Sequence, residues 1–275
     1  MSNFKLRDVI HSYKYALNDE EKTVKPKTRS KVAKPSINRK KIDSKITDRY
    51  TKQDHDLKDL PPSVKPGLTL VFVGFNPGVE SSKKQHHYAH PTNLFWKLFN
   101  ALDILSVVLD IRNVSVLAHG KLISEIYCDG KSQARAEHDF KLLDLGIGFT
   151  DLVLRCTKQA SELSLHEKAE NVPRLLKEFE ISQAPFIVFI GKGIWEVVCK
   201  YLVPKHRLNA HNFSWGLQKD LLVMLRFNTF CLHRPEVYVF PNTSGLVALM
   251  KYPQKLDLWQ NLVADMRKIP DSENG

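Results

Sequence analysis

One segment constrains this chain more than any other. From Leu68 to Trp96, an apolar strand runs into a tight turn and then into a polar loop. Residues Val71 to Val73 have the apolar pattern of a strand that is buried on both faces. Pro77 and Gly78 predict a turn directly after Asn76, because proline presets φ and glycine tolerates tight backbone geometry. Asn76 is therefore expected at the carboxyl end of a strand, where open α/β sheets bind their ligands.

Apolar runs alternate with amphipathic segments along the rest of the chain. Strands are predicted at Leu68–Phe75, Phe186–Ile190 and Val237–Phe240. A capping box of Ser164 and Glu167 opens a helix that is predicted over Leu165–Phe179. Further helices are predicted near Asn93–Leu102, Ser132–Leu143, Ile194–Leu202 and Lys255–Lys268. This alternation predicts an α/β fold, a three-layer α/β/α sandwich with a mostly parallel central sheet.

Charge separates a basic tail from a more balanced remainder. The formal net charge is +11, which favours polyanionic partners. Residues 1–58 hold 16 Lys and Arg against 8 Asp and Glu. The run 22–45 has ten basic residues and no aromatic one, so it cannot bury enough apolar surface to fold alone. We predict a largely disordered tail over 1–60, one catalytic domain over 61–270 and a disordered end over 271–275.

The basic tail suggests a use as well as a structure. A flexible basic arm can bind phosphates nonspecifically and hold a protein on DNA. The cluster from Arg39 to Lys41 fits a nuclear import signal, so we expect a nuclear protein. A tail that only keeps the chain in solution is the alternative interpretation.

Cysteine spacing and hydropathy exclude several classes of protein. Cys128, Cys156, Cys199 and Cys231 include no CxxC pair, which argues against zinc and against an iron–sulfur cluster. Buried free thiols are expected instead. No apolar run has the length of a membrane span, and the N-terminus lacks the apolar core of a signal peptide. We expect an intracellular protein without a membrane, a metal or a cofactor.

Five ordered blocks resemble one enzyme family, the mismatch-specific uracil/thymine DNA glycosylases, and we expect a eukaryotic member of it. The blocks are GFNPG at 74–78, HHYAHPTNLFW at 86–96, GIGFTDLV at 146–153, FIGKGIWE at 189–196 and FPNTSGL at 240–246. The resemblance covers roughly residues 67 to 267 and implies the fold of the uracil-DNA glycosylases. The stretch Asp103–Lys131 is longer than the usual connection of the family, and we assign it no role.

The resemblance implies roles for residues around the first strand. Asn76 would position the attacking water through its amide oxygen, since asparagine cannot remove a proton as a carboxylate can. Tyr88 would stack on an extruded base, and backbone N–H groups near Phe75 and Tyr88 would bind the base carbonyls. Ser81 and His87 would line the base pocket. A Tyr88 packed on the domain surface is the alternative, and the three nearby histidines lack the supporting ligands that a metal site needs.

Asp151 departs from the family, whose members commonly have Asn or Lys at this position. As a carboxylate it accepts hydrogen bonds only, which suits the N3–H of uracil or the N1–H of hypoxanthine. A protonated carboxyl could donate instead, and assistance to the water is a third role. Asp151 could equally be a simple cap of the strand-to-loop turn.

A late loop matches the segment with which the family fills the hole left by a flipped base. Asn242, Ser244, Gly245 and Leu246 are the DNA-binding candidates in this loop, with Leu246 as the apolar wedge. Thr243 replaces a proline of some relatives and Ala248 replaces an arginine, which puts preference for a partner guanine in doubt. Lys192 is the candidate phosphate contact at a helix start, with a solvated surface lysine as the alternative.

Three functions fit these patterns to different degrees. The favoured one is a monofunctional glycosylase that flips uracil, mismatched thymine or other damaged bases from double-stranded DNA and hydrolyses the N-glycosidic bond. The second is a noncatalytic DNA or chromatin adaptor on the same fold. The third is a nucleotide-binding α/β enzyme, which is disfavoured because the phosphate-binding motifs of such enzymes do not follow the first strand of this chain. No lysine lies in the catalytic motif, so no lyase activity is expected. The expected partners are damaged duplex DNA and downstream abasic-site repair proteins, and the expected state is a monomer.

Overall fold

A mostly parallel sheet lies at the centre of the fold. The computed structural model describes residues 57–268 except 115–119, 129 and 246–249. Within these residues one sheet has the strand order β4-β1-β5-β7-β6, in which only β6 runs antiparallel to its neighbour. The strands are β1 (Leu70–Gly74), β4 (Ile147–Asp151), β5 (Phe186–Ile190), β7 (Glu236–Phe240) and β6 (Gly216–Leu217). The three predicted strands are thus confirmed, with ends that differ by at most two residues.

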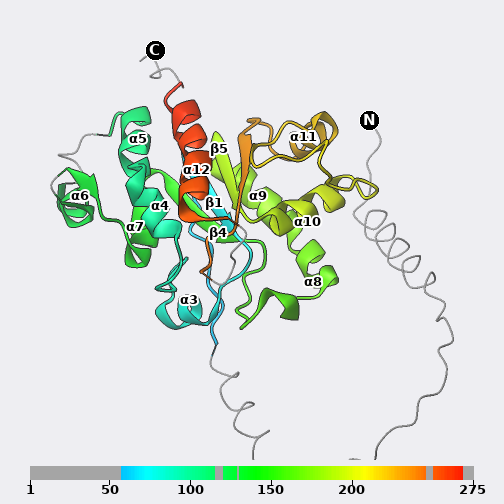
Figure 1. Cartoon of the computed structure of the whole chain (residues 1–275), viewed down its shortest axis with the longest axis horizontal. Helices are drawn as coiled ribbons and strands as arrows, with labels where there is room; N and C mark the ends of the chain where they lie inside the picture. The colour runs from blue at the N-terminus through cyan, green and yellow to red at the C-terminus, as the bar shows by residue number, and fades with distance from the viewer. Residues whose placement is uncertain (1–56, 115–119, 129, 246–249, 269–275) are drawn as a thin grey trace, which may run out of the picture. The chain divides into compact units, whose positions relative to one another are not determined.

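Helices cover both faces of this sheet, as the three-layer prediction requires. Figure 1 shows α4, α5 and α12 on one side and α9, α10 and α11 on the other. The longer helices are α5 (Ile104–Ile111), α9 (Val172–Ser182), α10 (Lys192–Leu202) and α12 (Tyr252–Met266). The shorter ones are α3 (Val79–Lys84), α4 (Phe95–Ala101), α6 (Gly120–Ile126), α7 (Asp139–Leu142), α8 (Leu165–Glu170) and α11 (Leu221–Phe227). Outside the central sheet, β2 (Tyr127–Cys128) pairs with β3 (Lys131–Ser132) in a small hairpin.

The two sides of β1 point into two separate apolar cores. Phe72 belongs to the core under α4, α5 and α12, whereas Val71 and Val73 belong to the core under α9 and α10. The Phe72 ring lies edge-on to Phe95, with 4.9 Å between ring centroids, and stacks on Trp259 at 5.6 Å. The strand is therefore buried on both faces, as its apolar run predicts.

Several predicted elements differ from the observed ones for local physical reasons. The helix predicted over Leu165–Phe179 is two helices, α8 and α9, because Pro173 at the start of α9 has no N–H to continue the first one. Ser164 caps α8 as expected, but the Glu167 carboxylate binds Arg155 instead of completing the box. In the helix predicted over Ser132–Leu143, Ser132 lies in β3 and only the last part is helical.

Two segments without predicted structure are helical. The polar stretch after the NPG turn begins with α3, which Gly78 precedes in extended conformation. The stretch Asp103–Lys131 contains α5 and α6, and Ile104, Leu105 and Val108 of α5 are completely buried. This long connection thus contributes to the core beside α12, with which α5 is in contact.

The cysteine prediction holds at three of four positions. Cys156, Cys199 and Cys231 are buried, and burial raises the pKa of each thiol. Cys128 is exposed, so the prediction is wrong there, because the hairpin of β2 and β3 lies outside the sheet. Among the described helices, none combines the length and the apolar character needed to cross a bilayer.

The packing of Phe72 yields a test of the fold. Phe72→Ala should lower the free energy of unfolding by about 3 to 5 kcal/mol, because it leaves a cavity among Phe95, Phe149 and Trp259. Leu232→Ala is the control, since Leu232 is 73% exposed and its loss should change stability by less than about 0.5 kcal/mol. Urea unfolding followed by tryptophan fluorescence measures both. Equal effects of the two substitutions would contradict this core.

Candidate active site

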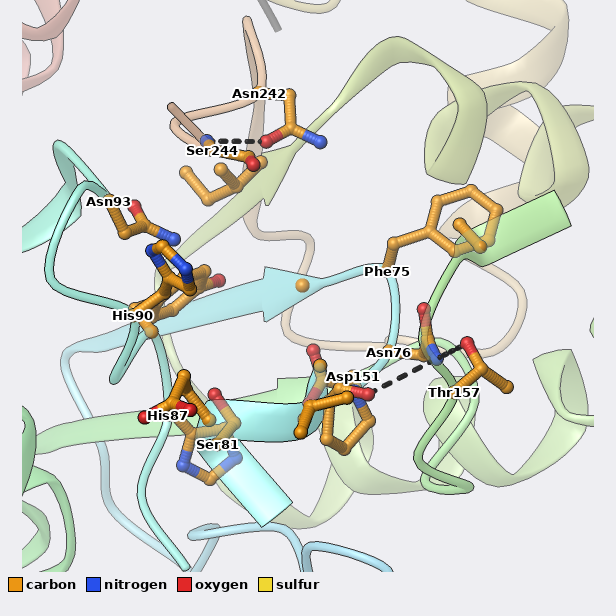
Figure 2. Close-up of a pocket in the computed structure, with 18 of the residues that line it drawn as sticks. Phe75, Asn76, Ser81, His87, His90, Asn93, Asp151, Thr157, Asn242 and Ser244 are labelled. Atoms are coloured by element: carbon orange, nitrogen blue, oxygen red, sulfur yellow. Dashed lines mark hydrogen bonds between the residues drawn. The ribbon is translucent and has the colours of Figure 1, made fainter. Parts of the chain in front are cut away.

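A cavity of about 680 Å³ opens at the carboxyl ends of the parallel strands. It has the size of a small-molecule site and lies at the sheet edge where such sites form. Figure 2 shows the labelled lining residues, which come from the end of β1, from α3 and the loop after it, from the end of β4 and from the loop after β7. The structure brings together eight of the predicted site residues: Phe75, Asn76, Ser81, His87, Tyr88, Asp151, Asn242 and Ser244.

Two predicted residues lie elsewhere, and a third lies outside the described residues. Lys192 begins α10, and its ammonium group lies 4.8 Å from the centroid of the Phe213 ring and 3.9 Å from Glu196. Gly245 packs on Thr92, whose Oγ1 would be 2.4 Å from a Cβ at position 245. Leu246 lies outside the described residues, and so does Ala248. Lys192 and Gly245 are therefore not part of the cavity lining.

The Asn76 side chain has a fixed orientation. Its amide nitrogen donates to Thr157 Oγ1 at 2.7 Å, to Arg155 O at 3.1 Å and to Pro77 O at 3.3 Å. Carbonyl oxygens only accept hydrogen bonds, so the nitrogen must face them and the amide oxygen must face away from them. This arrangement leaves the oxygen of Asn76 available as an acceptor in the cavity.

Thr157 is a site residue that the sequence analysis missed. Its buried hydroxyl donates to Gln159 O at 2.8 Å. The same hydroxyl accepts from the Asn76 amide at 2.7 Å, a bond that Figure 2 shows. Its backbone N–H donates to Pro77 O at 3.2 Å. A polar residue that follows the strand beside β1 was the available signal, because parallel strands end at the same edge.

Gly74 makes room for two side chains of the cavity lining. A Cβ at Gly74 would be 2.0 Å from Asp151 Oδ1 and 3.3 Å from the Tyr88 hydroxyl. Gly74 lies opposite Asp151 in the pairing of β1 with β4. Any side chain at this position would displace the Asp151 carboxylate.

Asp151 is a buried carboxyl group with no hydrogen-bond partner for its side chain among the described residues. Burial raises its pKa to about 6, and the proximity of His87 and Arg174 acts in the opposite direction. Above pH 6 the group is therefore an acceptor-only carboxylate in a cavity. The interpretation of Asp151 as a simple cap of the turn is not supported, since its side chain caps no described backbone group.

Arg174 of α9 fixes the backbone that carries Asp151. Its Nη2 donates to the carbonyl oxygens of Asp151 and Leu152, at 2.6 and 2.9 Å. Its Nη1 binds Glu178, whose other oxygen accepts from Thr150 Oγ1 at 2.7 Å. The ion pair of Arg174 and Glu178 in α9 thus holds the end of β4 through hydrogen bonds.

Tyr88 lines the cavity and packs against the aromatic core. One face stacks on Phe95, with 4.0 Å between centroids and 6° between ring planes. Its backbone is in the left-handed region at φ 54°, and its hydroxyl is buried without a described partner. Burial, followed by the charge of Asp151, raises the Tyr88 pKa well above its usual value, so the hydroxyl stays protonated. The ring face opposite Phe95 is the one that a ligand could meet.

Two backbone N–H groups are available as donors at the cavity. Neither Phe75 N nor Tyr88 N donates to an acceptor among the described residues, although both residues line the cavity. Ser81, by contrast, accepts from Ala89 N through its buried Oγ, at 3.4 Å. The cavity therefore offers backbone donors from its β1 edge and from the loop after α3.

His87 is a buried side chain of the cavity lining that Asp139 holds in place. The ring is 2% exposed, and its Nδ1 lies 2.8 Å from Asp139 Oδ2. Its Nε2 is buried and has no hydrogen-bond partner among the described residues. Asp139 escaped the sequence analysis because it lies 52 positions away from His87 in a segment without a motif.

The loop after β7 is tied to the domain through its backbone. Lys255 of α12 is buried and donates to Asn242 O at 2.6 Å, and Leu94 N donates to Thr243 O at 2.9 Å. Burial lowers the pKa of the Lys255 ammonium group. Asn242 Oδ1 accepts from Ser244 N at 2.7 Å, which closes the turn shown in Figure 2. The loop is thereby held at the rim of the cavity.

Comparison with known families agrees with this geometry. A family model described as the uracil DNA glycosylase superfamily matches residues 61–264, which is well over half of the chain. The match includes every described residue of the cavity lining. As for metals, no cluster of three His, Cys, Asp or Glu side chains with metal-binding geometry is found in the described part of the chain.

The raised pKa of Asp151 predicts a pH dependence of stability. A carboxyl whose pKa is about 6 when folded binds protons more tightly than the unfolded chain, so its contribution is full below about pH 4 and is lost as the pH rises through 6. The change in the free energy of unfolding that Asp151→Asn causes should therefore be more favourable at pH 8 than at pH 4, by on the order of 2 kcal/mol. Urea unfolding at both pH values measures this difference. Asp257→Asn, at an exposed carboxylate, is the control, and the same effect of Asp151→Asn at both pH values would contradict the prediction.

Proposed function

The chain belongs to the uracil DNA glycosylase superfamily, and from that premise we propose that it is a monofunctional glycosylase of the mismatch-specific uracil/thymine type. The superfamily assigns it a hydrolytic DNA N-glycosylase activity on uracil-like bases and a role in base excision repair. Our proposal adds that uracil, mismatched thymine or other deaminated bases are flipped from duplex DNA and removed without strand cleavage.

The orientation of Asn76 carries this proposal. Cleavage of a base from deoxyribose passes through an oxocarbenium-like sugar, so the enzyme needs a placed water more than a strong nucleophile. With its nitrogen bound to Thr157, Arg155 and Pro77, Asn76 presents a fixed oxygen that can accept a hydrogen bond from that water. Asp151 in the same cavity supplies an acceptor-only group above pH 6, for the water or for a ring N–H of the base.

The remaining lining supports the binding of a flat heterocycle. Tyr88 backs on Phe95 and offers its other ring face for stacking, worth roughly 1 to 3 kcal/mol per base. The free N–H groups of Phe75 and Tyr88 suit base carbonyls, on which negative charge develops as the base departs. The loop at Asn242 to Ser244 would approach the DNA strand at the rim.

A panel of damaged duplexes tests the proposal. Purified protein is incubated with duplexes that hold one uracil, thymine, hypoxanthine or ethenocytosine opposite guanine, and abasic sites are then cleaved with alkali. Wild-type protein should form abasic sites on uracil. Binding with a steep salt dependence but no cleavage of any duplex would favour the noncatalytic adaptor instead. The nuclear location, the monomeric state and the repair partners stay predictions.

Substitutions at Asn76 and Thr157 test the water site. Asn76→Ala should lower the single-turnover rate on uracil by about 100-fold or more, because the water loses its acceptor. Thr157→Val should also lower the rate, because it removes the hydroxyl that accepts from the Asn76 amide, and Thr157→Ser should retain most of it. If Thr157→Val and Thr157→Ser gave the same rate, the hydroxyl would have no part in orienting Asn76.

Gly74→Ala tests the close approach of Asp151. The added Cβ would be 2.0 Å from Asp151 Oδ1, so the carboxylate must move and the single-turnover rate on uracil should fall by about 100-fold. Gly120→Ala is the matched control, because a Cβ there meets nothing within 4 Å and Gly120 lies outside the cavity lining. A Gly74→Ala variant with the wild-type rate would show that the position of Asp151 does not matter.

A further inference from the structure

Exposed apolar side chains gather on a part of the domain that the proposed function does not use. Among the described residues, six of the seven exposed large apolar side chains lie in α11, in the turn after it or at the end of α9. They are Leu221, Leu222 and Leu225 of α11, Phe230 and Leu232 of the turn, and Ile181 of α9. We call this group the α11 face. Single exposed apolar residues are ordinary, but a group of this kind marks a contact surface.

The α11 helix turns one apolar side to the core and another to solvent. Val223 and Phe227 are completely buried, and the Phe227 ring lies 5.9 Å from the ring of Phe179 in α9. Leu221 and Leu225, four positions apart, share the outer side of the helix and are 72% and 58% exposed. A helix that is apolar on all sides is normally buried on all sides. The outer side of α11 is therefore uncovered within the described part of the chain.

Hydrogen bonds hold the turn after α11 against α9. Phe230 N donates to Phe227 O at 3.0 Å, and Leu232 N donates to Glu180 Oε2 at 3.0 Å. Ile181 follows Glu180 directly in α9. The apolar residues of the turn and of α9 are thus attached to one another through defined backbone contacts.

Three exposed basic side chains border the α11 face. Lys177 is four positions before Ile181 in α9, and Arg226 is four positions after Leu222 in α11. Each of the two therefore shares a side of its helix with an apolar residue of the face. Arg234 lies at the end of the turn. None of the three side chains has an ion pair or a hydrogen bond with another described residue.

The carboxylates that directly precede apolar residues of the α11 face are already engaged. Glu180 accepts from Leu232 N and lies 3.5 Å from His233 Nδ1. Asp220 lies 3.1 Å from His206 Nε2. The α11 face is thus apolar with a positive border. A second copy of the chain would bring like charges together at this border, whereas an acidic partner would pair with them.

The α11 face lies away from the cavity. Ile181 precedes the amino end of β5 and Leu232 precedes the amino end of β7, whereas the cavity opens at the carboxyl ends of the strands. Figure 1 shows α11 and the cavity-lining helix α3 at opposite ends of the domain. No residue of the α11 face lines the cavity. A partner that is bound here would leave the cavity open to DNA.

We propose that the α11 face is a docking site for an acidic amphipathic helix of a partner protein. A helix is the fitting element, because it can lay an apolar side along α11 with anchors at i, i+3, i+4 and i+7. Its apolar side would cover the exposed leucines, and its carboxylates would pair with the three basic residues of the border. This inference goes beyond the proposed function, since it assigns a second binding surface that can be occupied while DNA is bound.

Two labelled peptides of identical composition test the proposal. Both contain about 18 residues of leucine, glutamate and alanine. One has its leucines at i, i+3, i+4 and i+7, and the other has the same residues in scrambled order. The full-length protein is titrated into each peptide and binding is followed by fluorescence anisotropy. The ratio of the Kd of the scrambled peptide to that of the patterned peptide is measured, because the basic tail attracts both peptides alike.

The wild-type protein should prefer the patterned peptide by about tenfold. Leu225→Ser should reduce this ratio by at least about threefold, and the double variant with Leu221→Ser should bring it to about one, because the apolar contact is lost. Arg226→Glu should also reduce the ratio, because it reverses one charge of the border. Leu165→Ser is the matched control, since Leu165 is 51% exposed on α8 and lies outside the α11 face. Urea unfolding should show that the variants keep the stability of the wild type.

Several results would overturn the proposal. One is a wild-type ratio of about one, and another is an equal loss of the ratio in Leu165→Ser and Leu225→Ser. A wild-type dimer that Leu225→Ser dissociates in sedimentation equilibrium would assign the α11 face to a second copy of the chain. A loss of binding to duplex DNA in Leu225→Ser would instead assign the face to DNA. The expected results are a monomer and unchanged DNA binding in this variant.

Discussion

The parallel pairing of β1 with β4, with Gly74 opposite Asp151, is the contact on which the cavity depends. The segments that follow these two strands stay hydrogen-bonded beyond the end of the sheet. Leu152 N donates to Gly74 O, Val153 N donates to Phe75 O and Thr157 N donates to Pro77 O, at 2.9 to 3.2 Å. Asn76 lies in the segment after β1 and Thr157 in the segment after β4. The backbone hydrogen bonds between these segments therefore set the 2.7 Å contact of the two side chains. A shift in strand register would separate them.

The two buried aspartates of this region are used in opposite ways. Asp139 has donors on both oxygens, which makes it a rigid support for His86 and His87. The Asp151 side chain has no described partner and an elevated pKa, which is a costly arrangement in a folded protein. Proteins keep such groups mainly where a ligand or a reaction uses them. Asp139 thus supports the structure of the site, whereas Asp151 is the carboxyl group that a ligand can contact.

Sequence reasoning reached the parts of the molecule that local patterns encode. The strand at β1, the turn that exposes Asn76 and the layered α/β fold follow from apolar runs and from turn chemistry. Thr157, Asp139 and Arg174 were missed, because each acts through a contact with residues 22 to 81 positions away that no local pattern records. The split between α8 and α9 was readable from Pro173, whereas α5 and α6 lay in a segment without a clear signal.

The attachment of the loop after β7 has a consequence for how this protein can change over evolution. Lys255 and Leu94 hold the loop through the carbonyl oxygens of Asn242 and Thr243, which every amino acid possesses. The side chain at position 243 can therefore vary while the path of the backbone is kept, whereas the side chain of Asn242 also closes the turn by accepting from Ser244 N. A loop anchored in this way can acquire new contacts with DNA by single substitutions, without first having to find a new conformation.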